Sequence, residues 1–226
     1  MPNHPLLVCR ADDLHVAESP RLWIVTSRVT DLARWMRVTA DDPQAGEDWP
    51  AEYLQQARQI TLGPVADPLD SEQPLLPVDS NFLFFAGIDR LTGHLVAGLT
   101  VTSSDGVSEI GGGVHHDYRA QGYGREVLDV ACGLVHRHFG IARLVAGCEV
   151  SNLASQRWLA GAGFTSASGP PTHTLANGRV IQSMWWERVD PDPELRCRRP
   201  RPRPRPRRRL FSRGRRVRTL PAAGRH

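Results

Sequence analysis

The chain has 226 residues, 40% of them hydrophobic, and a formal net charge of +4, so it is long enough to bury one full-sized core. No window approaches the roughly 20 apolar residues of a membrane-spanning helix, and the chain does not start with a basic segment and a long apolar run, so we expect a cytoplasmic protein without membrane contact. Its four cysteines are widely spaced and match neither a disulfide framework nor a C-x-x-C motif, so we expect no metal.

Charge divides the chain into two opposed parts. The sequence contains no lysine, and half of its 28 basic residues lie from Arg196 onward, whereas all 24 acidic residues precede that point. Residues 1–195 therefore carry a net −10, and the last 31 residues carry +14. Alternating arginine and proline predict a disordered or polyproline-like tail over 191–226. Such a tail binds nucleic-acid phosphates or an acidic surface, or it is solvated without a dedicated partner.

The first third of the chain has few strong secondary-structure signals. Thr30 is expected to cap a helix, with Asp31 in its first turn, and Pro50 is tolerated near the start of a second helix. The predicted elements, in order, are an irregular N-terminal extension (1–20), a strand (22–27), a helix (30–36), a second helix (48–60) and a long loop rich in proline and acid (62–80).

From Asn81 the pattern becomes clearer. Two apolar, β-prone runs, 81–88 and 94–102, are separated by a short polar link with a glycine, which predicts a hairpin. The segment EIGGGV (109–114) predicts a third strand whose glycines weaken it or open a bulge. A glycine-rich turn, HHDYRAQGYG (115–124), follows this strand.

A strand-helix-strand unit and a hairpin complete the predicted domain. A helix after the turn has its apolar residues at steps of three, four and seven and ends at Gly140. Asn152 is expected to cap a short helix that ends at Gly163, and Asn177-Gly178 is the strongest two-residue turn signal in the chain. The remaining predicted elements are a strand (141–150), the short helix (151–163) and the closing hairpin strands (172–175 and 179–189).

The glycine-rich turn lies at a helix N-terminus, where backbone N–H groups bind anions. It is not a P-loop, because that motif needs a lysine. It is not a dinucleotide-binding G-x-G-x-x-G turn either, because Val127 occupies the place of the third glycine. The N–H groups from Gln121 to Arg125, with Arg119 nearby, suit a pyrophosphate whose remainder lies along the preceding strand.

The segment RAQGYG (119–124) resembles the [QR]-x-x-G-x-[GA] motif of the GNAT superfamily of acyl-CoA-dependent N-acyltransferases. The likeness continues in the strand at 109–114, in N-x-x-S (152–155) and in Gly163-Phe164, and it spans about residues 22–189. Leu159 stands where many members carry a tyrosine, and together with N-x-x-S it makes the chain most similar to the RimJ/RimL-type branch, which acetylates protein N-termini and includes enzymes for small amines.

The resemblance implies an α/β GNAT fold over 21–190, with a mixed, mostly antiparallel sheet, splayed central strands and flanking helices. It also implies acetyl-CoA as co-substrate and direct acetyl transfer to a primary amine, on a protein N-terminus or a small molecule, by a monomer or homodimer. Its implied cofactor contacts are Val114, Arg119, Gln121, Gly122, Tyr123, Gly124, Arg125 and Asn152, with the N–H of Val114 or a neighbouring glycine serving the thioester carbonyl.

Catalytic roles are implied for two residues, each with an alternative. Glu109 occupies the family's usual position for a general base, or it is a solvent-facing strand residue. Ser155 protonates the leaving thiolate in place of the missing tyrosine, or it caps a helix. His115 or His116 shares the task of the base, or both are loop histidines. Trp158, Trp185 and Trp186 are expected in the core or the cleft wall rather than on the cofactor.

Two other functions remain open at this stage. One is a GNAT-fold protein that binds CoA or a partner without catalysis. The other is an adaptor that associates with ribosomes or nucleic acid through its basic tail.

Overall fold

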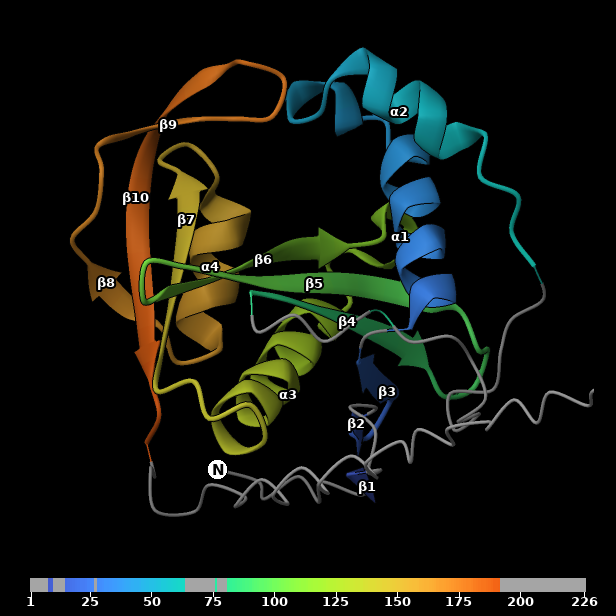
Figure 1. The fold of residues 1–226 in the computed structure, drawn as a ribbon, viewed down its shortest axis with the longest axis horizontal. Helices are drawn as coiled ribbons and strands as arrows, with labels where there is room; N and C mark the ends of the chain where they lie inside the picture. The colour runs from blue at the N-terminus through green and yellow to red at the C-terminus, as the bar shows by residue number, and fades with distance from the viewer. Residues whose placement is uncertain (1–7, 10–14, 27, 64–75, 77–80, 192–226) are drawn as a thin grey trace, which may run out of the picture.

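The computed structural model describes residues 8–9, 15–26, 28–63, 76 and 81–191. Within these residues one ten-stranded sheet has the order β1-β2-β3-β4-β5-β6-β7-β10-β8, and β9 pairs with β10 outside this path (Figure 1). The predicted basic tail and most of the predicted loop at 62–80 lie outside the described residues, and the domain limits stay predictions.

The elements follow in chain order. The strands are β1 (Val8–Cys9), β2 (His15–Glu18), β3 (Leu22–Thr26), β4 (Phe82–Asp89), β5 (Leu95–Ser104), β6 (Val107–Val114), β7 (Arg143–Glu149), β8 (Thr165–Ala167), β9 (Thr172–Thr174) and β10 (Val180–Val189). The helices are α1 (Val29–Asp41), α2 (Ala51–Arg58), α3 (Tyr123–Arg137) and α4 (Leu153–Gly161), with 3-10 turns η1 (Ala45–Glu47) and η2 (His116–Tyr118).

The mixed, mostly antiparallel α/β architecture expected from the sequence is confirmed, with corrections near the N-terminus. β2 is a strand paired with β3, so the prediction of an irregular chain up to Pro20 is wrong for His15–Glu18. Helix α1 begins at Val29 after Arg28, and the hydroxyl of Thr30 is buried without a hydrogen-bond partner, so the predicted Thr30 cap is wrong. The short edge strand β8 was not predicted.

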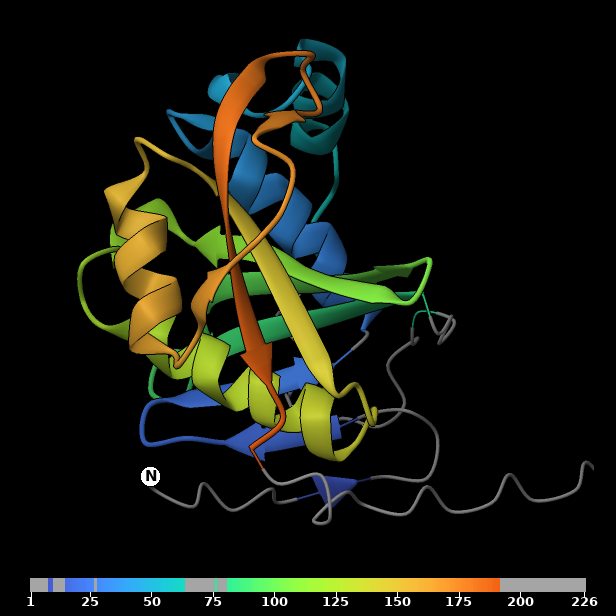
Figure 2. The ribbon, with the colours of Figure 1, turned by 90° about the vertical axis from the view of Figure 1, so that its left-hand side faces the viewer.

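Helices cover both faces of the sheet (Figure 2). Side chains alternate between the two faces along a strand, so neighbouring residues of β5 contact helices on opposite faces of the sheet. Leu99 belongs to the large core that α3 fills, whereas Gly98 faces the indole of Trp35 on α1. We call the side of the sheet that Trp35 covers the α1 face. No helix among the described residues is long and apolar enough to cross a membrane.

The two central strands separate. β5 and β6 remain paired along the whole length of β6, from Val107 to Val114. β6 and β7 are parallel and share a single register pair, Glu109 with Val145. Beyond that pair the strands diverge, which exposes unpaired backbone groups of β6 to the gap. This divergence matches the expectation of splayed central strands.

Candidate active site

A small cavity of about 70 Å³ lies where β6 and β7 diverge. The backbone of β6 is shaped there by Gly112, whose φ of +136° is unfavourable for any side chain. A Cβ at Gly112 would also lie 2.2 Å from the carbonyl oxygen of Gly98, so only glycine fits this position. The residues that line the cavity are Ile110, Gly111, Gly112, Ala146, Gly147, Ser155, Trp158 and Leu159.

The glycine-rich turn leads directly into α3. Ala120 and Gly122 both have positive φ, +60° and +84°, and Gly122 is the N-cap residue of the helix. No side chain caps this end, and the backbone bond of Glu126 to the Gly122 carbonyl oxygen is long, at 3.4 Å. The first backbone N–H groups of a helix have no carbonyl partner within the helix, so those of this turn could bind an anion, and the pyrophosphate site stays a prediction.

Arg21, which precedes β3, braces this turn from outside. Its guanidinium donates to the carbonyl oxygen of Gln121 at 2.9 Å and to the Glu126 carboxylate at 2.8 Å, and it lies 4.2 Å from the centre of the Tyr123 ring. Glu126 also accepts a hydrogen bond from the hydroxyl of Ser19 at 2.6 Å. No short-range sequence pattern predicts these contacts, because the partners are about a hundred residues apart.

Several side chains predicted to bind the cofactor have partners within the protein. Arg119 forms an ion pair with Asp42, just after α1, and donates to the carbonyl oxygen of Val114 at 3.2 Å. The side chain of Gln121 donates to the carbonyl oxygen of Asp117, and the hydroxyl of Tyr123 donates to Asp89. These side chains hold the turn in shape, which leaves its backbone N–H groups to contact a ligand.

Trp158 forms the wall between the turn and the cavity. Its indole N–H donates to the carbonyl oxygen of Gly124 in the first turn of α3. A Cβ at Gly124 would lie 3.2 Å from that indole nitrogen and 3.3 Å from a methyl group of Val114. Glycine at 124 therefore permits close packing of α3, α4 and β6, and Trp158 packs against the core and lines the cavity.

Asn152 and Ser155 divide the roles at the start of α4. The side-chain oxygen of Asn152 accepts the backbone N–H of Ser155 at 3.0 Å, so Asn152 is the helix cap, as predicted. The alternative in which Ser155 caps the helix is wrong. Ser155 instead lines the cavity between β6 and β7, where its hydroxyl suits the predicted proton donor.

Glu109 lies at the closed end of the splay. It pairs with Thr102 of β5 on one side and with Val145 of β7 on the other, and it is half-buried. Burial raises the pKa of this carboxyl group, and the nearby charge of His173 lowers it in part. A carboxylate with a raised pKa binds a proton more readily near neutral pH, which suits a general base.

The comparisons with known proteins agree with this geometry. The model of an acetyltransferase (GNAT) domain matches residues 21–165. The chain belongs to the GNAT acetyltransferase family. The family resemblance drawn from the sequence is thereby confirmed. No curated protein matches the sequence.

Solved structures of acetyltransferases share the fold of this GNAT domain at low sequence identity. A putative ribosomal-protein-serine acetyltransferase from Vibrio cholerae has 19% identity and a TM-score of 0.57, and the match covers 80% of this chain and 100% of that one. RimL, a ribosomal L7/L12 alpha-N-protein acetyltransferase in complex with coenzyme A, has 14% identity, a TM-score of 0.54 and coverages of 76% and 95%. The microcin C7 self-immunity acetyltransferase MccE, in complex with acetyl-CoA and AMP, has 11% identity, a TM-score of 0.53 and coverages of 76% and 94%.

The α1 face of the GNAT domain is partly closed by a strap between two distant segments. The β9–β10 turn reaches the segment before α2 (Figure 1). Asn177 donates to the carbonyl oxygen of Glu47 at 2.7 Å. Arg179 donates to the same oxygen at 3.1 Å and pairs with Glu149 at the end of β7, also at 3.1 Å. We call Asn177 and Arg179 the strap residues.

The two histidines before the turn lie away from Glu109. His115 is six residues from Glu109 along extended chain, which corresponds to roughly 20 Å. The rings of His115 and His116 stack at 4.5 Å, and burial, followed by the charge of His116, lowers the pKa of His115. The structure therefore does not bring either histidine together with Glu109, and the hypothesis of a shared base is not supported.

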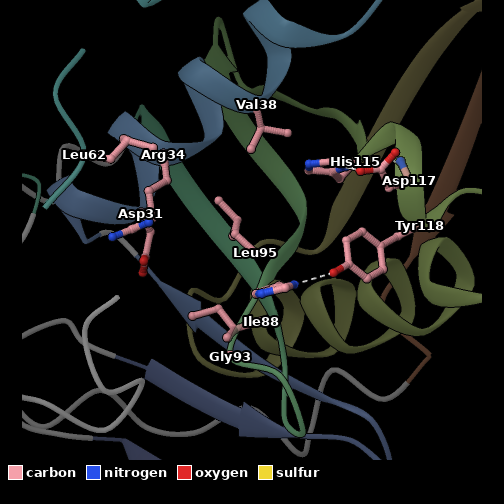
Figure 3. Close-up of a pocket in the computed structure, with 11 residues that line it drawn as sticks. Asp31, Arg34, Val38, Leu62, Ile88, Gly93, Leu95, His115, Asp117 and Tyr118 are labelled. Atoms are coloured by element: carbon pink, nitrogen blue, oxygen red, sulfur yellow. Dashed lines mark hydrogen bonds and ion pairs between the residues drawn. The ribbon is translucent and has the colours of Figure 1, made fainter. Parts of the chain in front are cut away.

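His115 instead faces a second cavity of about 340 Å³ beside α1 (Figure 3). The ring of His94 and the hydroxyl of Tyr118 are 2.6 Å apart at its edge. His115, His116 and Asp117 bring ligand atoms within 4.8 Å of one another, but Asp117 is 70% exposed and accessible to water, so we assign no metal to this group. The lining residues are Asp31, Arg34, Val38, Leu62, Ile88, Gly93, His94, Leu95, His115, Asp117 and Tyr118.

Proposed function

We propose that this GNAT protein transfers an acetyl group from acetyl-CoA to a primary amine by direct attack of the amine on the thioester. The observation that carries the proposal is the uncapped start of α3 at Gly122, next to the cavity between β6 and β7. The first feature suits a pyrophosphate and the second suits a slender arm that ends in a thioester. Coenzyme A has both parts.

The cofactor would be bound mainly by backbone groups. The N–H groups of residues 121–125 would hold the pyrophosphate, with Arg125, an exposed residue in the first turn of α3, adding positive charge. Asn152 uses its side-chain oxygen to cap α4, so its NH₂ group remains for the pantetheine arm. Binding of acetyl-CoA by MccE and of coenzyme A by RimL, whose folds are similar, supports this assignment.

Acetyl transfer requires three proton and charge adjustments. Glu109 would take a proton from the ammonium group, which frees the nitrogen lone pair for attack on the thioester carbon. Of the candidates, Val114 and the neighbouring glycines, a glycine nearer to Glu109 would stabilise the negative charge on the carbonyl oxygen through its N–H, because Val114 lies roughly 16 Å from Glu109 along the extended strand. The C–N bond then forms and the C–S bond breaks. The hydroxyl of Ser155 would protonate the departing thiolate, and the second proton that the nitrogen loses on becoming an amide would restore the hydroxyl.

The acceptor would approach from the α1 face. Gly98 and Thr102 of β5 are four residues apart, so they share a face of the sheet, and Trp35 covers this face at Gly98. Glu109 pairs with Thr102 and therefore lies on the same face. The RimJ/RimL-type resemblance favours a protein N-terminus or a small amine as the acceptor. Both present a primary amine that is cationic at neutral pH.

A thermal-shift titration with acetyl-CoA tests the cofactor site. Acetyl-CoA should raise the melting temperature of the wild-type protein, and Arg125→Gln should weaken this effect, because it removes charge beside the pyrophosphate. Arg137→Gln, at the other end of α3, is the matched control and should leave the effect unchanged. An equal effect of acetyl-CoA on all three proteins would count against the site.

Two competing functions predict different results. A CoA-binding protein without catalysis would give the thermal shift but no thiol release with any amine. An adaptor that works through the basic tail would lose its association with ribosomes or nucleic acid when residues 196–226 are deleted, and the lost binding would be sensitive to salt. Acetyl transfer that persists without the tail would assign the chemistry to the GNAT domain alone.

A further inference from the structure

Gly111 is an uncovered position on the α1 face of β6. It pairs with Thr100 of β5, so it shares this face with Glu109. Among the residues that the structure describes, its two chain neighbours aside, none has an atom within 4 Å of a Cβ built at Gly111, and the residue is exposed. Open space therefore begins directly above the strand, two residues from the proposed general base.

Two glycines on the strands that flank β6 are covered by tryptophan rings. A Cβ at Gly98, on β5, would lie 2.2 Å from the ring of Trp35, and a Cβ at Gly147, on β7, would lie 3.2 Å from the ring of Trp185. Gly111 and Gly147 are each two residues beyond the Glu109–Val145 pair, so they face each other across the splay. An uncovered glycine thus lies between two half-buried indoles.

The fold gives no reason for glycine at 111. Its φ lies outside the left-handed region, and a side chain would meet no neighbour, unlike at Gly112. Glycine in a strand costs conformational entropy and contributes no packing, so it destabilises the strand relative to alanine. A residue that weakens the strand without helping the fold indicates a requirement for space above it.

We propose that Gly111 is a specificity-determining residue, which admits a primary amine on an unhindered carbon and excludes amines on bulky carbons. The inference rests on the proposed acetyl transfer. The reacting nitrogen must lie near Glu109 and the thioester together, and the surface above Gly111 borders both. A side chain at 111 would occupy the volume that the carbon next to the amine needs.

The surroundings of Gly111 favour a cation. Glu109 supplies a carboxylate on the same face. Two nearby carboxylates are paired, Glu149 with Arg179 and Glu187 with Arg143, and His173 lies on β9.

Steady-state kinetics on Gly111→Ala and Gly111→Val test the inference. One set of acceptors is tripeptides that start with glycine, alanine or valine, and the other is methylamine, ethylamine and isopropylamine. We expect kcat/KM for the bulkiest member of the accepted set to fall about 10- to 100-fold in Gly111→Val, and that for the smallest to fall less than threefold. The set that is turned over identifies the acceptor as a peptide N-terminus or an alkylamine.

Ser166→Val, which enlarges an exposed side chain on β8, is the control for adding bulk to a strand and should leave kcat/KM unchanged. Because Gly111 also lines the cavity proposed for the coenzyme arm, the affinity for acetyl-CoA is measured by calorimetry in all variants, and it should fall much less than kcat/KM for the bulkiest acceptor. A uniform loss across acceptors, or an equal loss of acetyl-CoA affinity, would overturn the role of Gly111. Failure of the wild-type protein to acetylate any amine would instead overturn the proposed function. If Gly111→Val does not fold, Gly111→Ala is the test, and its kcat/KM must fall more for bulky acceptors than for small ones.

Discussion

Trp158 donates its indole N–H to the carbonyl oxygen of Gly124, which joins α4 to the first turn of α3. This bond fixes the proposed pyrophosphate site against the cavity between β6 and β7. Because Gly124 is also in close contact with Val114, the three elements that surround the proposed coenzyme meet at one residue.

Gly124→Ala should weaken acetyl-CoA binding more than it destabilises the fold. The added methyl group would lie 3.2–3.4 Å from Trp158 and Val114, so the first turn of α3 must shift by a few tenths of an ångström. Calorimetry should give about a tenfold loss of affinity, which corresponds to about 1.4 kcal/mol. Gly133→Ala, where a Cβ meets no atom within 4 Å, is the matched helix control. Equal affinities in both variants would contradict the proposed packing role.

Glu126→Gln should destabilise the protein at neutral pH. Burial would raise the pKa of Glu126, but hydrogen bonds from Ser19 and Arg21 outweigh it, so the pKa is lowered. We expect a loss of roughly 1 kcal/mol at pH 7, because Arg21 is 42% exposed and solvent screens its charge.

The pH dependence of this loss separates charge from shape. A group with a lowered pKa in the folded state contributes stability above its unfolded pKa, about 4.3, and this contribution is lost as pH falls through the folded pKa. Urea unfolding of wild type and Glu126→Gln should therefore give curves that converge in acid. A difference that is constant from pH 3 to pH 7 would refute the charge contribution.

Glu109→Gln should raise the stability of the protein and lower its catalytic activity. The pKa of Glu109 is raised by burial, so its stabilising contribution is present below the unfolded pKa and is lost as pH rises through the folded pKa. The amide variant avoids the ionised form, and its melting temperature should exceed that of the wild type by about 1–4 °C at pH 8 and by little at pH 4.

The same change should lower kcat about 100-fold if Glu109 is the general base. In the wild type, kcat/KM should rise with pH through the raised pKa of Glu109 and then level off. Thr102→Val, at the neighbouring position of β5, should preserve this profile. An unchanged profile in Glu109→Gln would show that another group accepts the proton.

Loss of the strap should affect the acceptor and not the coenzyme. Arg179→Gln removes the ion pair with Glu149, and Asn177→Ala removes the bond to the Glu47 carbonyl oxygen. Since both contacts close the α1 face, the double variant should raise KM for the amine several-fold and leave acetyl-CoA affinity unchanged. Arg188→Gln, which breaks a pair with Asp129 on the opposite side of the sheet, is the control.

The sequence predicted the features that depend on short-range patterns. The Asn152 cap of α4 was predictable because the side-chain oxygen and the N–H that it accepts are only three residues apart. The glycine turn before α3 and the hairpins followed in the same way from turn chemistry and alternation. Motif resemblance then supplied the coenzyme that these local features alone leave unnamed.

Features that depend on contacts between distant segments were not predictable. Arg21 and Glu126 form a hydrogen bond because the fold packs the start of β3 against the start of α3. Neither segment contains a pattern that predicts this contact. β2 is too short to be recognised without its partner β3. Arg119 was expected at the phosphate, but the structure directs its side chain to Asp42, which lies 77 residues earlier. His115 and Glu109 are close in sequence and lie at opposite ends of β6.

The most direct test is an acetylation assay followed by mass spectrometry. The protein would be incubated with acetyl-CoA carrying an isotopically labelled acetyl group and with the peptide and alkylamine sets. We predict the mass of one labelled acetyl group on a primary amine, with stoichiometric release of coenzyme A, and a loss of about 100-fold in Glu109→Gln. Saturable acetyl-CoA binding without labelled product in either set would contradict a catalytic role, and absence of binding would contradict the proposed coenzyme site.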